Sequence, residues 1–420
     1  MHSKLLLISF YFPPFNMVAS RRWAKHLKYM QKDGVDFHVL TRHFEYKNSP
    51  WDKDIESFEN KIIRLNYEPK HPYFKTRLPA SMVQKILWKL SYLKWKYIKK
   101  RENTFIGDDT IGSESLFLEK AIEIIAEKKI SNVILTVGPF RFSAILPELK
   151  SRFPDVKFSL DYRDYWHDSK EHLPEDFFEN EMRLQDKVLK SVDYITVVNE
   201  EMKEHFFKKV GSDKSILVLP HCFDPEDLDK FEKKKEQKTI NPSQIKFIYG
   251  GALYSDMDNY IKLYVHFIQA LYASGKITHT SFYVPYKAYE KEFSDVKDKV
   301  EFLDYVPSDS FFEILEQNDF VLYFRPDWSP NAFSSKFFEL VALRKPILYF
   351  GPKSDVSEFI KVNNLGLHFD ESSFNDSMKD FIDLLEKKKQ INFQYNIEPH
   401  TFSYNNKKLY EFLHIKNVEA

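Results

Sequence analysis

Short apolar runs alternate with segments of helical periodicity along most of the chain. Such alternation is typical of a parallel β-sheet with helices packed on its faces. In the first half, apolar runs predict strands at 4–12, 35–41, 61–65, 132–137, 157–162, 194–198 and 216–220. Helical periodicity lies between them at 21–33, 115–129 and 177–191. Gly34 follows the first of these helices, where a glycine commonly ends a helix.

The alternation starts again after a charged segment, 224–244, that contains few apolar residues. Strands are predicted at 246–251, 281–286, 300–306, 319–324 and 346–351, and helices at 259–274, 308–317, 335–343 and 402–415. We therefore expect an α/β protein with two Rossmann-like, doubly wound domains, over 1–223 and 245–400. The segment 224–244 is interpreted as a linker, and 401–420 as a C-terminal helix. Ligands of such sheets bind at the carboxyl ends of the strands.

The composition of the chain excludes some classes of function. Lys plus Arg and Asp plus Glu both number 62, so the net charge is zero and a bulk polycation for coating nucleic acid is excluded. Cys222 is the only cysteine, which excludes an internal disulfide and favours a reducing compartment. The apolar run at 5–12 is too short for a membrane span. Because Pro13 and Pro14 follow it, we interpret it as a buried strand rather than a signal peptide.

The segment 324–351 has the residues best suited to binding an anion. Arg325 follows a predicted strand, and a loop then leads to Ser334, Ser335 and Lys336 at the start of a predicted helix. Free backbone N–H groups at a helix N-terminus, with hydroxyls and a lysine, suit a diphosphate. Glu339 lies one turn further, where a carboxylate can accept hydrogen bonds from ribose hydroxyls. The alternative is a serine-capped helix with an ordinary ion pair.

A second group follows the predicted strand at 157–162. Asp161, Arg163, Asp164 and Trp166 lie at its carboxyl end, where two carboxylates and an arginine can orient an acceptor hydroxyl or act as a base. We favour Asp164 for that role. A structural ion pair between Asp161 and Arg163 is the alternative.

The segment 83–101 has seven basic residues, four aromatic residues and no acidic residue. On a helical projection, one side carries apolar residues from Val83 to Ile98, interrupted only by Lys94, and the opposite side carries lysines. This profile is typical of a helix that lies in the plane of a membrane interface. A helix packed on the N-terminal domain is the alternative. The membrane-facing set is Lys85, Trp88, Lys89, Trp95, Lys96 and Lys99.

Several segments in chain order resemble the large retaining family of GT-B glycosyltransferases, family 4-like, that includes bacterial surface-polysaccharide enzymes. They are FYFPPFNMVASRRWAKHL (10–27), TVGPFRFSAIL (136–146), LDYRDYW (160–166), VLPHCFD (218–224), FIYGGALY (247–254) and SSKFFELVALRKPIL (334–348). The resemblance covers most of the chain. It implies a GT-B fold, with two domains facing a cleft and a C-terminal helix that returns to the N-terminal domain.

The resemblance also implies site residues. Glu339 would bind the ribose, and Ser334, Ser335, Lys336 and Arg325 would face the diphosphate. Gly250 and Gly251 would let the backbone approach the donor. Asn16, Ser20 and Arg21 stand where the family often has a glycine-rich loop, so they would belong to the acceptor side. The alternative for Arg21 is a position on the solvated outer face. Asn331 replaces the first of two glutamates that the family often has. Asp164, Asn331 and Lys336 are the catalytic candidates.

We therefore expect a cytoplasmic glycosyltransferase, peripheral on the inner face of the cell membrane, that acts in surface-polysaccharide or lipopolysaccharide synthesis. It would transfer a sugar from a nucleotide-sugar to a glycan or lipid-linked acceptor with retention and without a metal or other cofactor. No motif predicts a metal site or a nucleic-acid partner. The alternatives are a nucleotide-sugar 2-epimerase of similar fold and a non-catalytic nucleotide-sugar-binding subunit.

Overall fold

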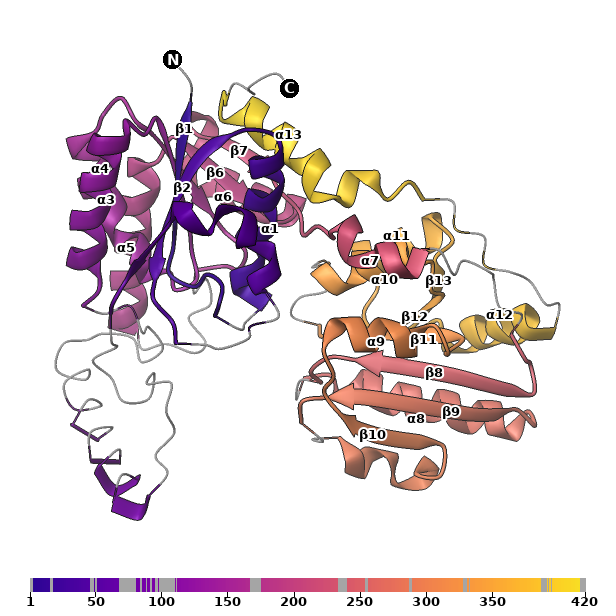
Figure 1. Ribbon diagram of the computed structural model, residues 1–420. Coiled ribbons are helices and arrows are strands. Elements are labelled where there is room, and N and C mark those ends of the chain that lie inside the picture. Colours follow the sequence, from indigo (N-terminus) through magenta and orange to yellow (C-terminus); the bar gives the residue numbers. More distant parts are fainter. Residues whose placement is uncertain are drawn as a thin grey trace. The chain divides into compact units, whose positions relative to one another are not determined.

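The structure is a computed structural model in which the chain divides into two compact units (Figure 1). Unit 1 consists of Met1–Pro220 with Phe402–Ala420, and unit 2 of His221–Thr401. The structure describes the chain except for residues 1–2, 16–17, 46–48, 50, 68–80, 84, 88, 91–92, 95–96, 98–109, 111, 167–174, 233–239, 254–255, 287–288, 328–330, 332, 387–390, 392, 394 and 416–420. Asn16, Trp88, Trp95, Lys96 and Lys99 therefore lie outside the described residues.

Unit 1 is built on a parallel sheet with the strand order β3-β2-β1-β4-β5-β6-β7. Its strands are β1 (Lys4–Ser9), β2 (Asp36–Arg42), β3 (Ile62–Leu65), β4 (Asn132–Thr136), β5 (Lys157–Asp161), β6 (Tyr194–Val197) and β7 (Ser215–Val218). Each overlaps a strand predicted from the sequence. The apolar run at the N-terminus is the central strand β1, and Leu5–Ile8 are buried because neighbouring strands and helices cover both faces.

The α-helices of unit 1 cover both faces of this sheet. They are α1 (Val18–Lys32), α3 (Glu114–Lys128), α4 (Leu146–Arg152), α5 (Glu175–Ser191), α6 (Glu200–Val210) and α13 (Phe402–Phe412). Short 3-10 helices occur at Asp52–Asp54, Glu56–Lys61, Arg141–Ile145 and Gly211–Asp213. Gly34 has a φ of +74° where α1 ends, and the N–H of Val35 closes that end on the carbonyl of Met30.

The C-terminal helix α13 packs on α1 of unit 1. The His26 Nδ1 and Asn406 Oδ1 atoms are 2.7 Å apart, and the Asn406 amide donates to the His26 carbonyl. Tyr410 donates to a carboxylate oxygen of Asp33 at 2.7 Å. The predicted return of the C-terminal helix to the N-terminal domain is therefore present in the structure.

Unit 2 repeats the architecture with six parallel strands in the order β10-β9-β8-β11-β12-β13. They are β8 (Gln244–Gly250), β9 (Ile277–Val284), β10 (Val300–Asp304), β11 (Phe320–Phe324), β12 (Ile347–Phe350) and β13 (Gly366–Phe369). Its helices are α7 (Pro225–Glu232), α8 (Asp258–Ala273), α9 (Ser308–Leu315), α10 (Ser335–Ala342), α11 (Asp355–Val362) and α12 (Phe374–Glu386), with 3-10 helices at Glu290–Val296 and Glu398–His400.

Phenylalanine and tyrosine rings fill the core of unit 2. Helices α8 and α12 pack on one face of the sheet, and α9, α10 and α11 pack on the other. The ring of Phe267 lies within 6 Å of those of Phe247, Phe350 and Phe381. Large rings packed edge to face fill the interior of unit 2. This agrees with the composition of the chain, which has many aromatic residues and few glycines.

The structure places the boundary between the units differently from the predicted linker at 224–244. Residues 225–232 form α7, whose Leu228 and Phe231 are buried in the core of unit 2. The Phe223 N–H donates to the His400 carbonyl, and Phe223 pairs with Thr401 as an isolated bridge. Both chain segments that connect the units are thus joined by backbone pairing within unit 2. Among the described residues, no helix is both long enough and apolar enough to cross a membrane.

Candidate functional site

A pocket opens in unit 2 where strands β8, β9 and β10 end. Its cavity volume is about 30 Å³. Its lining consists of Gly250, Gly251, Tyr283, Tyr305, Val306, Ser308, Phe311, Phe312, Lys336 and Glu339. Four of these, Gly250, Gly251, Lys336 and Glu339, are donor-site residues predicted from the sequence. The carboxyl end of a parallel sheet is where ligands of this architecture bind.

Lys336 is the cation of this pocket, which we call the donor pocket. It lies in the first turn of α10, and its Nζ donates to the carbonyl oxygen of Gly250 at the end of β8. The same Nζ lies 5.5 Å from the centre of the Phe311 ring. Burial lowers the pKa of Lys336, and the nearby Glu339 carboxylate opposes that shift. A half-buried lysine beside a helix N-terminus gives the pocket a positive charge.

Gly250 and Gly251 are each required to be glycine for a different structural reason. A Cβ atom on Gly250 would lie 2.3 Å from Cε2 of Phe311, so its absence makes room for the aromatic wall of the pocket. Gly251 has a φ of +151°, a backbone conformation that L side chains rarely adopt. The sequence predicted these glycines at the site, but Phe311 itself carried no motif that would have identified it.

Ser334 and Arg325 are placed around α10 rather than in the described lining of the donor pocket. Ser334 is the N-cap residue of α10, and its hydroxyl oxygen accepts from the Phe337 N–H at 3.2 Å. Tyr323 donates to the same hydroxyl oxygen. Ser334 thus has the capping role that was the alternative to diphosphate binding. Arg325 follows β11, and its N–H donates to the Phe350 carbonyl. The side chain of Ser335 lies outside the described part.

Asn331 lies next to a different helix. Its Oδ1 accepts a hydrogen bond of 3.0 Å from the backbone N–H of Asp355, the first residue of α11. The N–H groups of a first helical turn have no partner within the helix, so this contact satisfies one of them. The amide therefore contributes to the N-terminus of α11.

In unit 1, Asp161 is fully buried at the carboxyl end of β5. Its carboxylate accepts from Trp23, Thr136 and Thr196 at 2.7, 3.0 and 2.7 Å. Burial alone would raise the pKa of Asp161, but the Arg22 charge at 3.6 Å and these hydrogen bonds lower it. The carboxylate is thus a structural centre that joins β4, β5, β6 and α1. This arrangement supports the structural interpretation of Asp161 rather than contact with an acceptor.

Trp166 and Arg163 are also held by unit 1 itself. Trp166 is fully buried, and its indole N–H donates to Glu181 at 2.9 Å while its ring stacks on Phe140. An Nη atom of Arg163 would lie 2.8 Å from a Cβ on Gly138. Of the residues predicted after β5, Asp164 is the exposed one, so it stays the acceptor-side candidate.

The start of α1 is organised by contacts within unit 1. The Ser20 hydroxyl donates to the carbonyl of Phe15 at 2.6 Å. Arg21 donates to Asp54 at 2.9 Å, and its guanidinium lies 4.2 Å from the centre of the Trp51 ring. These contacts give Ser20 and Arg21 structural partners and leave their acceptor-side role a prediction.

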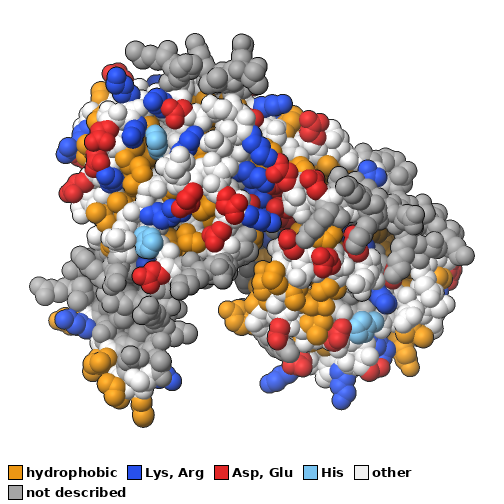
Figure 2. All heavy atoms as spheres, viewed as in Figure 1, with side chains coloured by type: hydrophobic (Ala, Val, Ile, Leu, Met, Phe, Trp, Pro, Cys, Tyr) orange, Lys and Arg blue, Asp and Glu red, His pale blue; other side chains and the backbone are white. Residues whose placement is uncertain are grey.

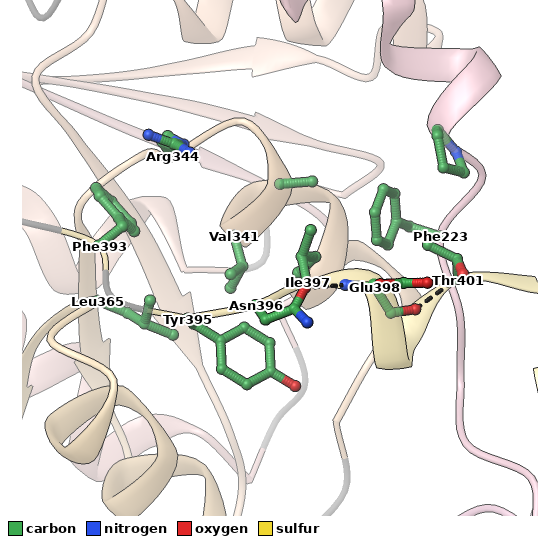
Figure 3. Close-up of a pocket in the computed structure, with 12 residues that line it drawn as sticks. Phe223, Val341, Arg344, Leu365, Phe393, Tyr395, Asn396, Ile397, Glu398 and Thr401 are labelled. Carbon is green, nitrogen blue, oxygen red and sulfur yellow. Dashed lines mark hydrogen bonds between the residues drawn. The ribbon is translucent and has the colours of Figure 1, made fainter. Parts of the chain in front are cut away.

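Two further pockets in unit 2 were not predicted from the sequence. One has an apolar wall that includes Phe223, Phe393 and Tyr395, and it lies beside Arg344 and Leu365, which precede β12 and β13 (Figure 3). The other is polar and lies where β11, β12 and β13 end. It is lined by Asn259, Tyr260, Asp327, Pro352, Lys353, Asp370, Glu371 and Ser372. Tyr260 donates to Asp327 there.

Comparison with known proteins shows similarity at the level of the fold. No family model matches the chain, and no curated protein matches its sequence. Among solved structures, a glycosyltransferase from Rickettsia africae has a TM-score of 0.57 at 13% identity, over 98% of each chain. Sucrose-phosphate synthase from Thermosynechococcus elongatus has a TM-score of 0.57 at 11% identity, over 98% of this chain and 94% of that one.

UDP-GlcNAc 2-epimerase from Neisseria meningitidis, bound to UDP-GlcNAc, has a TM-score of 0.51 at 13% identity. That comparison covers 98% of this chain and 100% of the epimerase. The two Rossmann-like sheets and these similarities together define a GT-B-like fold, which confirms the fold class predicted from the sequence.

Proposed function

We propose that the protein is a glycosyltransferase that uses a nucleotide-sugar donor and binds its nucleoside diphosphate in the donor pocket. The observation that carries this proposal is that one pocket holds Lys336, Glu339, Gly250 and Gly251. These residues come from α10 and the end of β8, more than 80 residues apart in the chain. Their convergence at the carboxyl end of a parallel sheet supports a ligand site more strongly than the motif at α10 alone.

Each part of the pocket suits a different part of such a donor. The Lys336 ammonium and the first turn of α10 provide positive charge for the diphosphate. Glu339, one turn further along α10, offers a carboxylate to the ribose hydroxyls. The rings of Tyr283 and Phe311 lie 6.1 Å apart in an edge-to-face arrangement and give the pocket an aromatic wall for a flat base.

During transfer, the bond between the sugar and the diphosphate breaks and negative charge develops on the leaving group. Lys336 and the α10 dipole would stabilise that charge, with Arg325 as a further cation from the loop after β11. We propose that transfer retains the configuration of the sugar and needs no metal. The acceptor would be a glycan or a lipid-linked glycan of cell-surface polysaccharide synthesis. These finer assignments rest on the family resemblance.

A nucleotide-sugar 2-epimerase is the second candidate. Its support is the similarity of the fold to UDP-GlcNAc 2-epimerases over nearly the whole chain. An epimerase inverts one carbon of the sugar and leaves the diphosphate linkage intact, so it needs no acceptor. A glycosyltransferase breaks that linkage and releases the nucleoside diphosphate.

The two functions are distinguished by the products formed from one nucleotide-sugar. The protein would be incubated with UDP-, GDP-, ADP-, CDP- and TDP-sugars, with and without a membrane glycolipid extract, and the products followed by NMR and mass spectrometry. We expect release of one nucleoside diphosphate and sugar transfer to the extract, both lost in Lys336→Met. A new sugar epimer with its nucleotide still attached would overturn the proposal in favour of the epimerase.

A further inference from the structure

Half of the exposed large apolar side chains in the described part of the chain belong to one short helical segment. The described residues between 82 and 97 are helical, and the Lys85 N–H donates to the Ser81 carbonyl. Seven apolar side chains of this segment are 54 to 80% exposed: Met82, Val83, Ile86, Leu87, Leu90, Leu93 and Tyr97. Figure 2 shows hydrophobic side chains gathered with lysine at the lower-left end of the view, where Figure 1 draws this segment.

The seven residues form a stripe rather than a scatter. Apart from the adjacent pairs Met82/Val83 and Ile86/Leu87, they recur every three or four positions up to Tyr97, which places them on one side of a helix. At 1.5 Å per residue, the stripe is about 20 Å long. The other exposed apolar side chains of the described part are dispersed singly along the chain, as is normal for a protein surface. Lys94 is a charged residue on the same side of the helix, so it interrupts the stripe at one position. An exposed apolar stripe of this extent indicates a surface that binds a partner.

The basic residues near the apolar stripe indicate which kind of partner covers it. From Pro69 to Arg101, the sequence has ten lysines and arginines and no acidic residue, within a chain of zero net charge. Lys85 and Lys89 are exposed residues of the same helical segment as the stripe. An apolar stripe flanked by lysines matches an anionic lipid surface, whose acyl region receives the apolar side chains and whose headgroups attract the cations. A second copy of this chain would instead bring two lysine-rich segments together.

We propose that the stripe from Met82 to Tyr97 docks on a membrane surface that contains anionic lipids, with the helix in the plane of the interface. Nucleic acid would engage the lysines but would leave the apolar stripe uncovered. The inference uses no residue of the donor pocket, so it stands or fails independently of the proposed function.

The full-length protein would be sedimented with vesicles of phosphatidylcholine alone and with vesicles that contain 30% phosphatidylglycerol. We expect at least tenfold tighter binding to the anionic vesicles, and this preference should weaken as salt is raised. The double variant Leu87→Ser/Leu90→Ser should bind at least tenfold more weakly. Lys85→Gln/Lys89→Gln should lose most of the preference for anionic lipid.

A matched control is Phe207→Ser/Val362→Ser, which changes two apolar residues that are 54 and 66% exposed elsewhere. It should bind vesicles like the unchanged protein. All six substituted side chains are exposed, so the melting temperatures of the three double variants should stay within 2 °C of the parent. Absence of vesicle binding, or binding unaffected by Leu87→Ser/Leu90→Ser, would overturn the proposal. The proposal would also be overturned if the protein bound no vesicles and light scattering showed a dimer that Leu87→Ser/Leu90→Ser abolishes. The stripe would then be an interface with a second copy of the chain.

Discussion

The Asn331 side chain accepts a hydrogen bond of 3.0 Å from the backbone N–H of Asp355. The contact joins the loop after β11 to the N-terminus of α11. In the family that the sequence resembles, a glutamate often occupies the position of Asn331. The Asn331 amide oxygen supplies an acceptor for the N-terminus of a neighbouring helix, a role that a carboxylate could also fill.

Substitution of Asn331 tests this contact. Asn331→Ala removes the acceptor and should lower the free energy of unfolding by about 1 kcal/mol. Asn331→Asp keeps an acceptor and places a negative charge at a helix N-terminus, so its stability should equal or exceed that of the parent by up to about 1 kcal/mol. Urea unfolding of both variants measures the difference. An Asn331→Ala variant as stable as the parent would show that the contact has no energetic role.

Substitution of Asp161 and of Asp164 should distinguish a structural carboxylate from a functional one. Asp161→Asn removes a buried charge that faces Arg22 and should destabilise the protein by about 3 kcal/mol. Asp164→Asn changes an exposed residue and should leave the unfolding free energy within about 0.5 kcal/mol. If Asp164 acts on the acceptor, its variant should lose sugar transfer while it still binds the nucleotide. A stable Asp161→Asn variant would contradict the structural role.

His26 should make the stability of the protein sensitive to acid. Burial, helped by the Arg22 charge, lowers the pKa of His26 to about 3 from the usual 6.5. The folded state therefore keeps His26 neutral over a range in which the unfolded state binds a proton. Its contribution is fully present above pH 6.5 and is lost as the pH falls toward 3.

Between pH 7 and pH 5, this one group should remove about 2 kcal/mol from the free energy of unfolding. His26→Gln does not titrate, so its stability should decline less over the same interval. Urea unfolding of both proteins at the two pH values gives the comparison, and the decline caused by other groups is common to both. Parallel declines would refute the contribution of His26.

Lys336 should make nucleotide binding sensitive to alkali. Because burial lowers its pKa, the ammonium loses its proton below the usual pKa of 10.5. Affinity for a nucleoside diphosphate should therefore fall as the pH rises through that lowered pKa. Lys336→Arg keeps its charge throughout this range, so its affinity should change less as the pH rises from 7 to 10.5. Titration calorimetry of both proteins measures this. If the two affinities change in parallel, the titration of Lys336 does not cause the pH dependence of binding.

The sequence predicted most of the architecture because buried parallel strands form short apolar runs that stand out from polar turns. It did not predict β13, because Gly366 and His368 leave that strand without a continuous apolar run. It also did not predict α7, because the acidic and basic residues of this helix resemble a linker. Tertiary packing determines the secondary structure of such segments. Leu228 and Phe231 of α7 are buried, although the segment as a whole is rich in charged residues.

The donor site could be predicted only in part, for a similar reason. Lys336 and Glu339 share one helix, so their spacing indicated a common site. Phe311 and Tyr305 reach the pocket from α9 and from the loop after β10, and no local pattern links those segments to α10. At Asp161, the sequence showed a carboxylate at a strand end but not the Trp23, Thr136 and Thr196 donors that surround it.

In the proposed function, the donor pocket binds a nucleoside diphosphate through Lys336 and Glu339. Titration calorimetry with UDP, GDP, ADP, CDP and TDP, in buffer that contains EDTA, measures this binding. The matched control is Lys361→Met, which changes an exposed lysine on α11. We predict that one diphosphate binds the parent and Lys361→Met equally, and binds Lys336→Met and Glu339→Ala at least tenfold more weakly. Absence of binding by every nucleotide, or equal binding by all four proteins, would contradict the account.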